Sequence, residues 1–262
     1  MLRSMNTMIG FKIAALDDDM GRVDDFYFDD AIWTTRYCVV QTGLWLQDRR
    51  VLVSPAVIEP PLWERELLPT QLTKTQIEQS PPIDLDKPVS LQMLEGLHRY
   101  YGWPDYWAAN PAVTGAPGGM NSYWAAMAQA EEIRRQENAQ QAGERDDAAD
   151  EGDAHLRSAR EVKGYRIQAI DGEIGHLEDL FVDETSWFIR YLLIDTHNWL
   201  PGRKVLISPD WVDHLSWDKS QIGVSVTQEK VRNSPEYNPK GPIDRDYEGI
   251  LYKHYGFPGY WL

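Results

Sequence analysis

The chain is poor in cysteine and in basic residues. Its 262 residues include one cysteine, Cys38, which excludes an intrachain disulfide framework and a metal site built from cysteines. Lys and Arg number 26 against 41 Asp and Glu, and the formal net charge is −15. Nucleic acids and anionic membrane surfaces attract basic proteins, so we expect no nucleic-acid partner.

Long hydrophobic runs are also absent from the sequence. No stretch approaches the roughly 18 consecutive apolar residues of a transmembrane helix, and we expect no direct membrane insertion. The first residues, MLRSMNTMIGFKI, lack the apolar core of a secretory signal peptide. We therefore expect a cytoplasmic protein.

Several catalytic motifs are missing as well. The sequence contains no G-x-G-x-x-G, no G-x-x-x-x-G-K-[ST] and no G-x-S-x-G, and no two of its six histidines have the i, i+4 spacing of a helical zinc site. We expect no catalytic residue, no cofactor and no metal. Cys38 lies in an apolar segment and is interpreted as a buried, inert thiol.

Three acidic clusters offer carboxylate oxygens, the ligands that Ca²⁺ and Mg²⁺ prefer. They lie at residues 17–19, 24–25 and 29–30, and their spacing fits no EF-hand loop. We favour the interpretation that these acids bond turn backbone or pair with arginine. A metal-dependent hydrolase that uses the acidic turns is an alternative.

An internal repeat organises the chain. Residues 9–107 align without a gap on residues 163–261, with 29 identities in 99 pairs, and we interpret this as a tandem duplication. The shared residues that we expect to support the fold are Gly21, Asp25, Asp29 and Arg36 in the first copy and Gly175, Asp179, Asp183 and Arg190 in the second.

The repeat predicts two domains of one kind, at residues 1–107 and 163–262. A linker at 108–162 joins them. It begins as coil, continues as a helix at about 121–141 where Ala, Glu, Gln and Arg dominate, and includes a disordered acidic stretch at 143–153.

Within each copy the local signals are mainly β. Short runs of β-branched and aromatic residues, separated by turns, are typical of a small β-barrel. In the second copy they predict strands at 165–170, 174–182, 187–195, 204–208, 212–217 and 222–226. A short helix is expected at 227–233 and a longer one at 244–255, capped by Asp244. Ser90 is the corresponding cap in the first copy.

A family resemblance rests on the order of these motifs. Each copy has a glycine–aromatic–basic–Ile start, an acidic strand ending in Asp, an aromatic strand and a [RK]-V-L-[IV]-S-P strand, which in the second copy are 164–167, 178–183, 187–195 and 204–209. A DG-x-x-G turn at 171–175 precedes the acidic strand there, whereas the first copy has three aspartates at 17–19. This order resembles the PRC-barrel family.

The resemblance implies an α+β chain with two tandem small PRC-type β-barrels, each followed by a short C-terminal helix. PRC-barrels form the cytoplasmic domain of the photosynthetic reaction centre H subunit and a domain of a ribosome maturation factor. Because the barrel is a docking module in both, the resemblance implies a non-enzymatic protein-interaction or assembly module of the bacterial stand-alone type. An H-subunit-like accessory of a membrane complex is an alternative. The sequence identifies neither the partner nor the process.

Two groups of residues are candidates for contact with a protein partner. Arg36 and Arg190 are expected to neutralise the shared aspartates, and an anionic partner is the alternative. The aromatic candidates either clamp each closing helix onto its barrel or form a docking patch, between the copies or in a homodimer. They are Trp45, Leu46, Tyr101, Trp103, Tyr106 and Trp107 in the first copy and Trp199, Leu200, Tyr255, Phe257, Tyr260 and Trp261 in the second.

Overall fold

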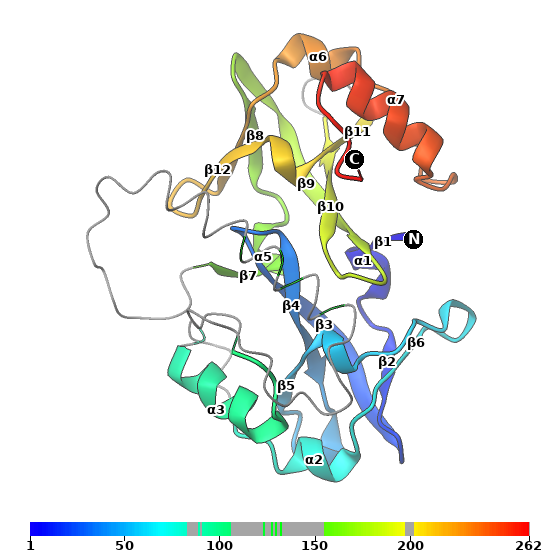
Figure 1. Cartoon of the computed structure of the whole chain (residues 1–262), viewed down its shortest axis with the longest axis vertical. Helices are drawn as coiled ribbons and strands as arrows, with labels where there is room; N and C mark the ends of the chain where they lie inside the picture. Colours follow the sequence, from blue (N-terminus) through cyan, green and yellow to red (C-terminus); the bar gives the residue numbers. More distant parts are fainter. Residues whose placement is uncertain are drawn as a thin grey trace. The chain divides into compact units, whose positions relative to one another are not determined.

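The computed structural model describes residues 1–82, 89, 91–105, 123, 127, 129, 132, 155–196 and 202–261. These residues form a mixed α+β structure, mostly strands in two sheets, with six α-helices in the described ranges (Figure 1). In the same ranges, no helix combines the length and the apolar character needed to cross a membrane.

The chain divides into two compact units. The first unit comprises Thr7–Ser158 with Glu184–Phe188, and the second comprises Met1–Asn6, Ala159–Asp183 and Ile189–Leu262. Each unit therefore includes a short segment that is separated along the chain from its main part. The boundaries of the two domains expected from the repeat stay a prediction.

The first unit contains a six-stranded sheet with the order β5-β4-β3-β2-β6, in which β7 pairs with β3. Its strands are β2 (Lys12–Ala14), β3 (Asp19–Asp29), β4 (Thr34–Gln41), β5 (Arg50–Val53), β6 (Leu67–Pro69) and β7 (Leu156–Ser158). All residues of β4 except Gln41 are buried, which places this strand in the core. The parallel pair β2–β6 is the one exception to antiparallel pairing among the described strands of this sheet.

Short helices connect the strands of the first unit. They are the 3₁₀ turns η1 (Leu44–Leu46), η2 (Pro55–Val57) and η3 (Trp63–Arg65) and the helices α2 (Lys74–Glu78) and α3 (Leu91–Tyr101). Helix α2 begins with a capping box, because the Thr73 hydroxyl accepts from the Gln76 amide while the Gln76 side chain accepts from the Thr73 amide. Helix α1 (Met5–Met8) lies where the chain passes from the second unit to the first.

The second unit contains a seven-stranded sheet with the order β11-β10-β9-β8-β13-β12, in which β1 pairs with β9. Its strands are β1 (Leu2–Ser4), β8 (Arg166–Ala169), β9 (Gly172–Asp183), β10 (Ile189–Asp195), β11 (Lys204–Ile207), β12 (Val212–Ser216) and β13 (Gln221–Val224). The six strands from β8 onward confirm the six predicted in the second copy, each ending within two residues of its expected range.

The helices of the second unit are α5 (Ala159–Val162), the 3₁₀ turn η4 (Pro209–Trp211), α6 (Gln228–Arg232) and α7 (Arg245–Tyr255). The expected cap of the long helix is confirmed, because the Asp244 side chain accepts a hydrogen bond from the Tyr247 amide. Gly256 ends this helix in the left-handed conformation that glycine adopts without a steric penalty.

Gly21 and Gly175 occupy the same position in the two sheets. Their φ angles are 150° and 141°, and a Cβ at either residue would overlap a backbone carbonyl of the neighbouring strand, at Gln41 or Asp195. Glycine is therefore required at both positions, because any side chain would push the neighbouring strand away.

The tryptophans shared by the copies do not begin a strand, although the sequence predicted strands from them. Trp33 and Trp187 have φ angles of 51° and 60°, and the strands that follow begin at Thr34 and Ile189. The left-handed backbone at each tryptophan belongs to the turn that precedes the strand.

Two other expectations concern the linker and the barrels. Tyr123, Met127, Gln129 and Glu132 have helical backbone, and the rest of the helix expected at 121–141 and the acidic stretch at 143–153 lie outside the described residues. In the described ranges, the strand pairing forms two sheets without a hydrogen-bonded closure between their end strands.

Candidate interaction site

A short strand from the start of the chain completes the sheet of the second unit. Strand β1 pairs antiparallel with the end of β9, with Leu2 opposite Asp183, Arg3 opposite Val182 and Ser4 opposite Phe181. Strand β8 pairs with the other half of β9, from Gly172 to His176. The long strand β9 therefore presents one edge that two different segments share.

The first unit is completed in the same way by a strand from the second half of the chain. Strand β7 pairs antiparallel with the end of β3, with Leu156 opposite Asp29, Arg157 opposite Phe28 and Ser158 opposite Tyr27 (Figure 1). At the shift of 154 residues, this register is identical to that of β1 on β9. The two sheets thus take their completing strands reciprocally, and we call β1 and β7 the exchanged strands.

Asp179 holds the first exchanged strand in register. Its carboxylate accepts hydrogen bonds from the Ser4 hydroxyl at 2.5 Å, the Asn6 amide at 3.1 Å and the Leu180 amide at 2.8 Å. Burial raises the pKa of this carboxyl, and the hydrogen bonds oppose that effect. The hydroxyl of Ser4, the last residue of β1, therefore donates to a buried carboxylate.

Asp25 makes the equivalent contact in the first unit. Its carboxylate accepts from the Ser158 hydroxyl at 2.5 Å and from the Phe26 amide at 2.8 Å, and the residue is 7% exposed. The sequence predicts that the shared aspartates bond turn backbone or pair with arginine. It does not predict the contact of Asp25 with a serine of a distant strand.

A signal for this contact was present in the sequence. The tripeptide Leu-Arg-Ser occurs at residues 2–4 and again at residues 156–158, which extends the repeat ahead of the aligned copies at the same shift. Residues 5–8 and 159–162 share no identity, so the tripeptide lies ahead of the gapless alignment that starts at residue 9.

A second segment of the second half of the chain also completes the first unit. The Thr35 amide donates to the Trp187 carbonyl at 2.9 Å, and Thr34 and Phe188 form an antiparallel bridge. The Trp187 side chain is buried, and its ring centre lies 6.1 Å from that of Phe26. The segment Glu184–Phe188 thus contributes both backbone and aromatic contacts to the first sheet.

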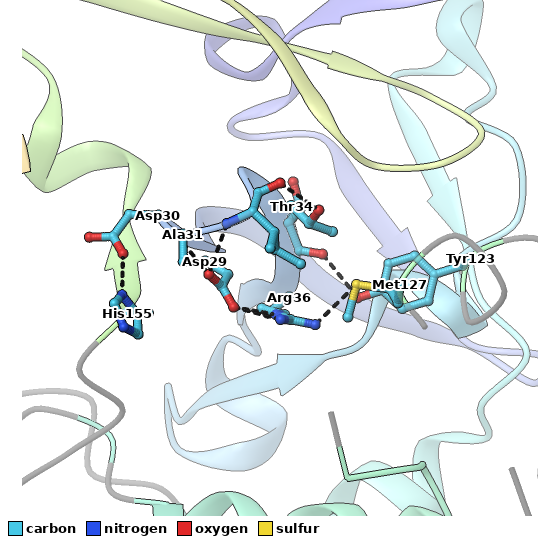
Figure 2. Close-up of polar contacts among 10 residues, drawn as sticks. Asp29, Asp30, Ala31, Thr34, Arg36, Tyr123, Met127 and His155 are labelled. Atoms are coloured by element: carbon cyan, nitrogen blue, oxygen red, sulfur yellow. Dashed lines mark hydrogen bonds and ion pairs between the residues drawn. The ribbon is translucent and has the colours of Figure 1, made fainter. Parts of the chain in front are cut away.

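Arg36 and Asp29 form a buried ion pair in the first unit (Figure 2). The guanidinium donates to one carboxylate oxygen from Nη2 at 2.5 Å and from Nε at 3.2 Å, and both side chains are at most 3% exposed. The other oxygen of Asp29 accepts from the backbone amides of Ala31 and Ile32. Asp29 thus both bonds a turn and pairs with arginine, as expected.

Two residues from the expected linker helix cover this ion pair. The Arg36 guanidinium donates to the Met127 sulfur at 3.0 Å, and the Tyr123 hydroxyl donates to the Thr35 carbonyl at 3.0 Å (Figure 2). Both covering side chains are buried. Burial raises the pKa of Tyr123 above its usual range.

Asp30, beside the ion pair, holds the segment that leads into β7. Asp30 Oδ1 lies 2.8 Å from His155 Nδ1 (Figure 2). Asp30 Oδ2 accepts from Arg157 Nε, also at 2.8 Å. The second exchanged strand is therefore held by side-chain contacts at Asp25 and Asp30 as well as by its ladder.

In the second unit, aromatic residues of the C-terminal tail cover the corresponding arginine. The guanidinium of Arg190 lies 4.2 Å from the ring centre of Tyr260, and that of Arg245 lies 4.3 Å from the ring centre of Trp261. The Tyr260 hydroxyl donates to the buried carboxylate of Glu248 at 2.8 Å, and the Tyr191 hydroxyl donates to the same oxygen at 2.9 Å.

The closing helices differ in their buried polar groups. In the first unit, His98 Nε2 lies 2.6 Å from the hydroxyl of Tyr37, and its Nδ1 lies 2.8 Å from the Pro104 carbonyl. Burial lowers the pKa of His98 to about 4, which keeps the ring neutral at pH 7. The equivalent residue of the second unit is Tyr252, whose hydroxyl lies 3.0 Å from that of Ser208.

The other aromatic candidates of the second unit pack within it. Tyr255 is buried, and the ring centre of Trp211 lies 4.5 Å from that of Tyr255 and 5.2 Å from that of Phe257. Tyr260 and Trp261 are half-buried. The docking patch in which the sequence places these residues stays a prediction.

Among the candidates of the first unit, Trp103 is buried and stacks on the half-buried Tyr101 at 4.4 Å. Trp45 and Leu46 are half-buried, and the Trp45 indole donates to the Met20 carbonyl at 2.7 Å. The neighbouring Leu44 is 89% exposed and is the large apolar side chain that this loop presents to solvent. Four candidates lie outside the described residues: Tyr106, Trp107, Trp199 and Leu200.

The acidic turn at residues 17–19 is engaged in local contacts. Asp18 pairs with Lys74 at 2.6 Å, and this contact lowers the pKa of the Asp18 carboxyl. Asp17 accepts from the Lys74 backbone amide. Within the part of the chain that the structure describes, no three His, Cys, Asp or Glu side chains are grouped so that they could hold a metal ion. Cys38 is buried, and burial raises the pKa of its thiol.

Comparison with known proteins adds no assignment to this site. No protein-family model matches the chain, and no curated protein matches it. The likeness to PRC-barrels therefore rests on the sequence motifs, and the exchanged strands are the feature from which a function is argued.

Proposed function

We propose that this chain is a non-enzymatic assembly module, built from two duplicated PRC-barrel-like domains, that binds protein segments by strand addition. The observation that carries the proposal is the reciprocal exchange of β1 and β7. Each of these strands occupies half an edge of a long strand in a sheet formed by the other half of the chain. The proposal keeps the cytoplasmic location expected from the sequence.

Strand addition is a general mode of peptide recognition. The acceptor supplies backbone amides and carbonyls to any extended segment, so affinity comes from the ladder and specificity from a few side-chain contacts. In the second unit, the acceptor residues are Phe181, Val182 and Asp183. In the first unit, they are Tyr27, Phe28 and Asp29.

The buried aspartates supply the specificity in this proposal. Asp179 and Asp25 each accept from a serine hydroxyl at 2.5 Å, and in both cases the serine is the third residue of the exchanged strand. A buried carboxylate that loses its donor is left with an uncompensated desolvation cost. A segment without a hydroxyl at that register therefore binds more weakly.

A peptide supplied in trans tests this function. We expect a chain lacking residues 1–4 to bind a synthetic peptide with the sequence of residues 1–7 in the millimolar range, since only three ladder pairs form. Amide chemical shifts of Phe181, Val182 and Asp183 report the binding site. The matched control is the same peptide with Ser4→Ala, which should bind several-fold more weakly.

A folded truncated chain whose shifts at these three residues do not move at millimolar peptide would contradict the proposal. The Asp179→Asn variant of the truncated chain separates charge from hydrogen bonding, because the amide side chain still accepts from the backbone. The reaction-centre accessory and the metal-dependent hydrolase stay predictions, since no contact among the described residues favours either one.

A further inference from the structure

A hydrogen-bonded loop of the first unit presents an apolar side chain to solvent. Leu44 is 89% exposed, more than any other large apolar side chain in the described part of the chain. The loop that carries it is held by hydrogen bonds from the backbone amides of Leu46 and Asp48 to the Gly43 carbonyl, at 3.3 and 2.8 Å. The backbone therefore holds this leucine out in water, although burial would stabilise it.

The same loop contains two consecutive residues in the left-handed conformation. Gln47 and Asp48 have φ angles of 54° and 55°, which residues other than glycine adopt at a conformational cost. The Gln41 side chain fixes this backbone, because its amide donates to the Asp48 carbonyl at 2.5 Å. Strained backbone of this kind clusters at binding sites. A loop that is already fixed also loses little conformational entropy when a partner binds.

Lys74 joins this loop to the turn between β2 and β3. Its Nζ lies 4.5 Å from the ring centre of Trp45, which is half-buried in the loop, and 2.6 Å from the carboxylate of Asp18 in the turn. The same turn carries Leu16, which is 69% exposed. The loop and the turn therefore lie side by side, and we call Leu16, Leu44 and Trp45 the tip patch.

Acidic side chains surround the tip patch. The turn and the loop contribute four exposed aspartates, which are Asp17, Asp18, Asp19 and Asp48. Lys74 pairs with Asp18, and Lys12 lies 4.0 Å from the Asp19 carboxylate. In the described part of the chain, the other two aspartates form no ion pair. The rim of the patch thus has an excess of negative charge, which attracts basic groups and repels acidic ones.

We propose that the tip patch binds a basic protein segment in which apolar side chains lie next to lysine or arginine. The apolar side chains of the segment pack on Leu44 and Trp45, and its basic groups lie beside the aspartates of the rim. A second copy of this chain fits poorly, because its net charge is also −15. The patch includes no residue of the strand-accepting edges, so the proposal is independent of strand addition.

A peptide with the sequence Lys-Lys-Leu-Leu-Lys-Lys and blocked ends tests the proposal on the whole chain. We expect it to shift the amide resonances of residues 15–19 and 43–48, and added salt to weaken its binding, because exposed charges are screened. Lys-Lys-Ser-Ser-Lys-Lys keeps the charge and Glu-Glu-Leu-Leu-Glu-Glu keeps the leucines, and both should bind several-fold more weakly. Equal binding of either peptide, or shifts confined to other residues, would overturn the proposal.

Surface variants assign the binding to the patch without disturbing the core. Leu44→Ser should weaken binding of the lysine–leucine peptide several-fold, since it removes the main apolar contact. Asp48→Asn should weaken it about twofold, and asparagine also tolerates the left-handed backbone at this position. The matched controls Ile170→Ser and Asp218→Asn change exposed residues of the second unit and should leave binding unchanged. A Leu44→Ser chain that binds as tightly as these controls rejects the patch as the binding site.

Discussion

The two units use one set of shared residues in different surroundings. In the first unit, Arg36 pairs with Asp29 in the core and is covered by Met127. In the second unit, Arg190 lies under the ring of Tyr260, and Asp183 is 27% exposed at 3.5 Å from the N-terminal ammonium. The arginine and aspartate are retained at both positions, while the segments that cover them differ. A repeat thus preserves strand register more strictly than it preserves the packing around it.

The largest expected difference between the units concerns these aspartates. Asp29→Asn leaves the charge of Arg36 buried without its carboxylate, and we expect it to lower the free energy of unfolding by about 3–5 kcal/mol. Asp183→Asn removes a partly exposed contact, which we expect to cost less than about 1 kcal/mol. Urea unfolding measures both variants, and hydrogen exchange of β4 and β10 amides assigns each loss to a unit. Equal losses would show that the two surroundings are equivalent.

Acid should destabilise the first unit before the second through His98. Its pKa in the folded unit is lowered to about 4, below the value of about 6.5 for an unfolded chain. Between these values the unfolded state binds more protons, so stability falls as pH decreases from 6.5 to 4. The full effect is on the order of 3 kcal/mol.

Tyr252 is the natural control for this prediction, because it occupies the equivalent position and does not titrate in that window. Hydrogen exchange in each unit at a series of pH values measures the slope. A His98→Gln variant should lose the slope of the first unit. A slope of the same size in the second unit would assign the effect to another group.

The contacts of the exchanged strands should have intermediate and similar effects. Asp25→Ala leaves a serine hydroxyl and one backbone amide without their acceptor, and Asp179→Ala leaves a serine hydroxyl and two backbone amides without theirs. We expect each substitution to cost about 1–3 kcal/mol. The Asn variants at the same positions should cost less, because the amide oxygen still accepts from backbone. Thermal unfolding checks all four variants. A harmless Asp179→Ala beside a costly Asp25→Ala would show that only β7 is needed for stability.

The smallest difference is expected at the first turns of α2 and α6. Both helices begin at a capping threonine, but the third helical residue is Gln76 in one and Lys230 in the other, and only Gln76 completes a capping box. Thr73→Ala and Thr227→Ala should each cost about 1 kcal/mol. Gln76→Ala should cost a few tenths of a kcal/mol more than an exposed control such as Gln79→Ala. Urea unfolding of these four variants resolves the order.

The local elements were predictable because their signals are local. The strand β10 follows from a run of β-branched and aromatic residues, and α7 follows from Asp244 and the helical spacing of Leu251 and Tyr255. Its buried Glu248 was not expected, because a glutamate is read as exposed until the hydroxyls of Tyr191 and Tyr260 are brought beside it by the fold. Sequence spacing alone does not reveal such partners.

The candidate site was only half predictable for the same reason. The pairing of Asp29 with Arg36 lies within one hairpin, and it is one of the roles that the sequence predicts for this aspartate. The pairing of Asp25 with Ser158 joins residues 133 positions apart, and a three-residue strand has no periodicity to announce it. In the sequence, only the repeated tripeptide Leu-Arg-Ser marks the exchanged strands. Its role as a strand that donates to a buried aspartate follows from the structure.

The way in which the chain passes between the units has a consequence for proteolysis. The chain passes from one unit to the other at residues 6–7, 158–159, 183–184 and 188–189. A single cut between residues 105 and 155 gives an N-terminal and a C-terminal fragment. Strand β1 of the N-terminal fragment pairs with β9 of the C-terminal fragment, and β7 of the C-terminal fragment pairs with β3 of the N-terminal one. The nicked protein therefore behaves as a two-subunit complex, and its halves are natural candidates for fragment complementation.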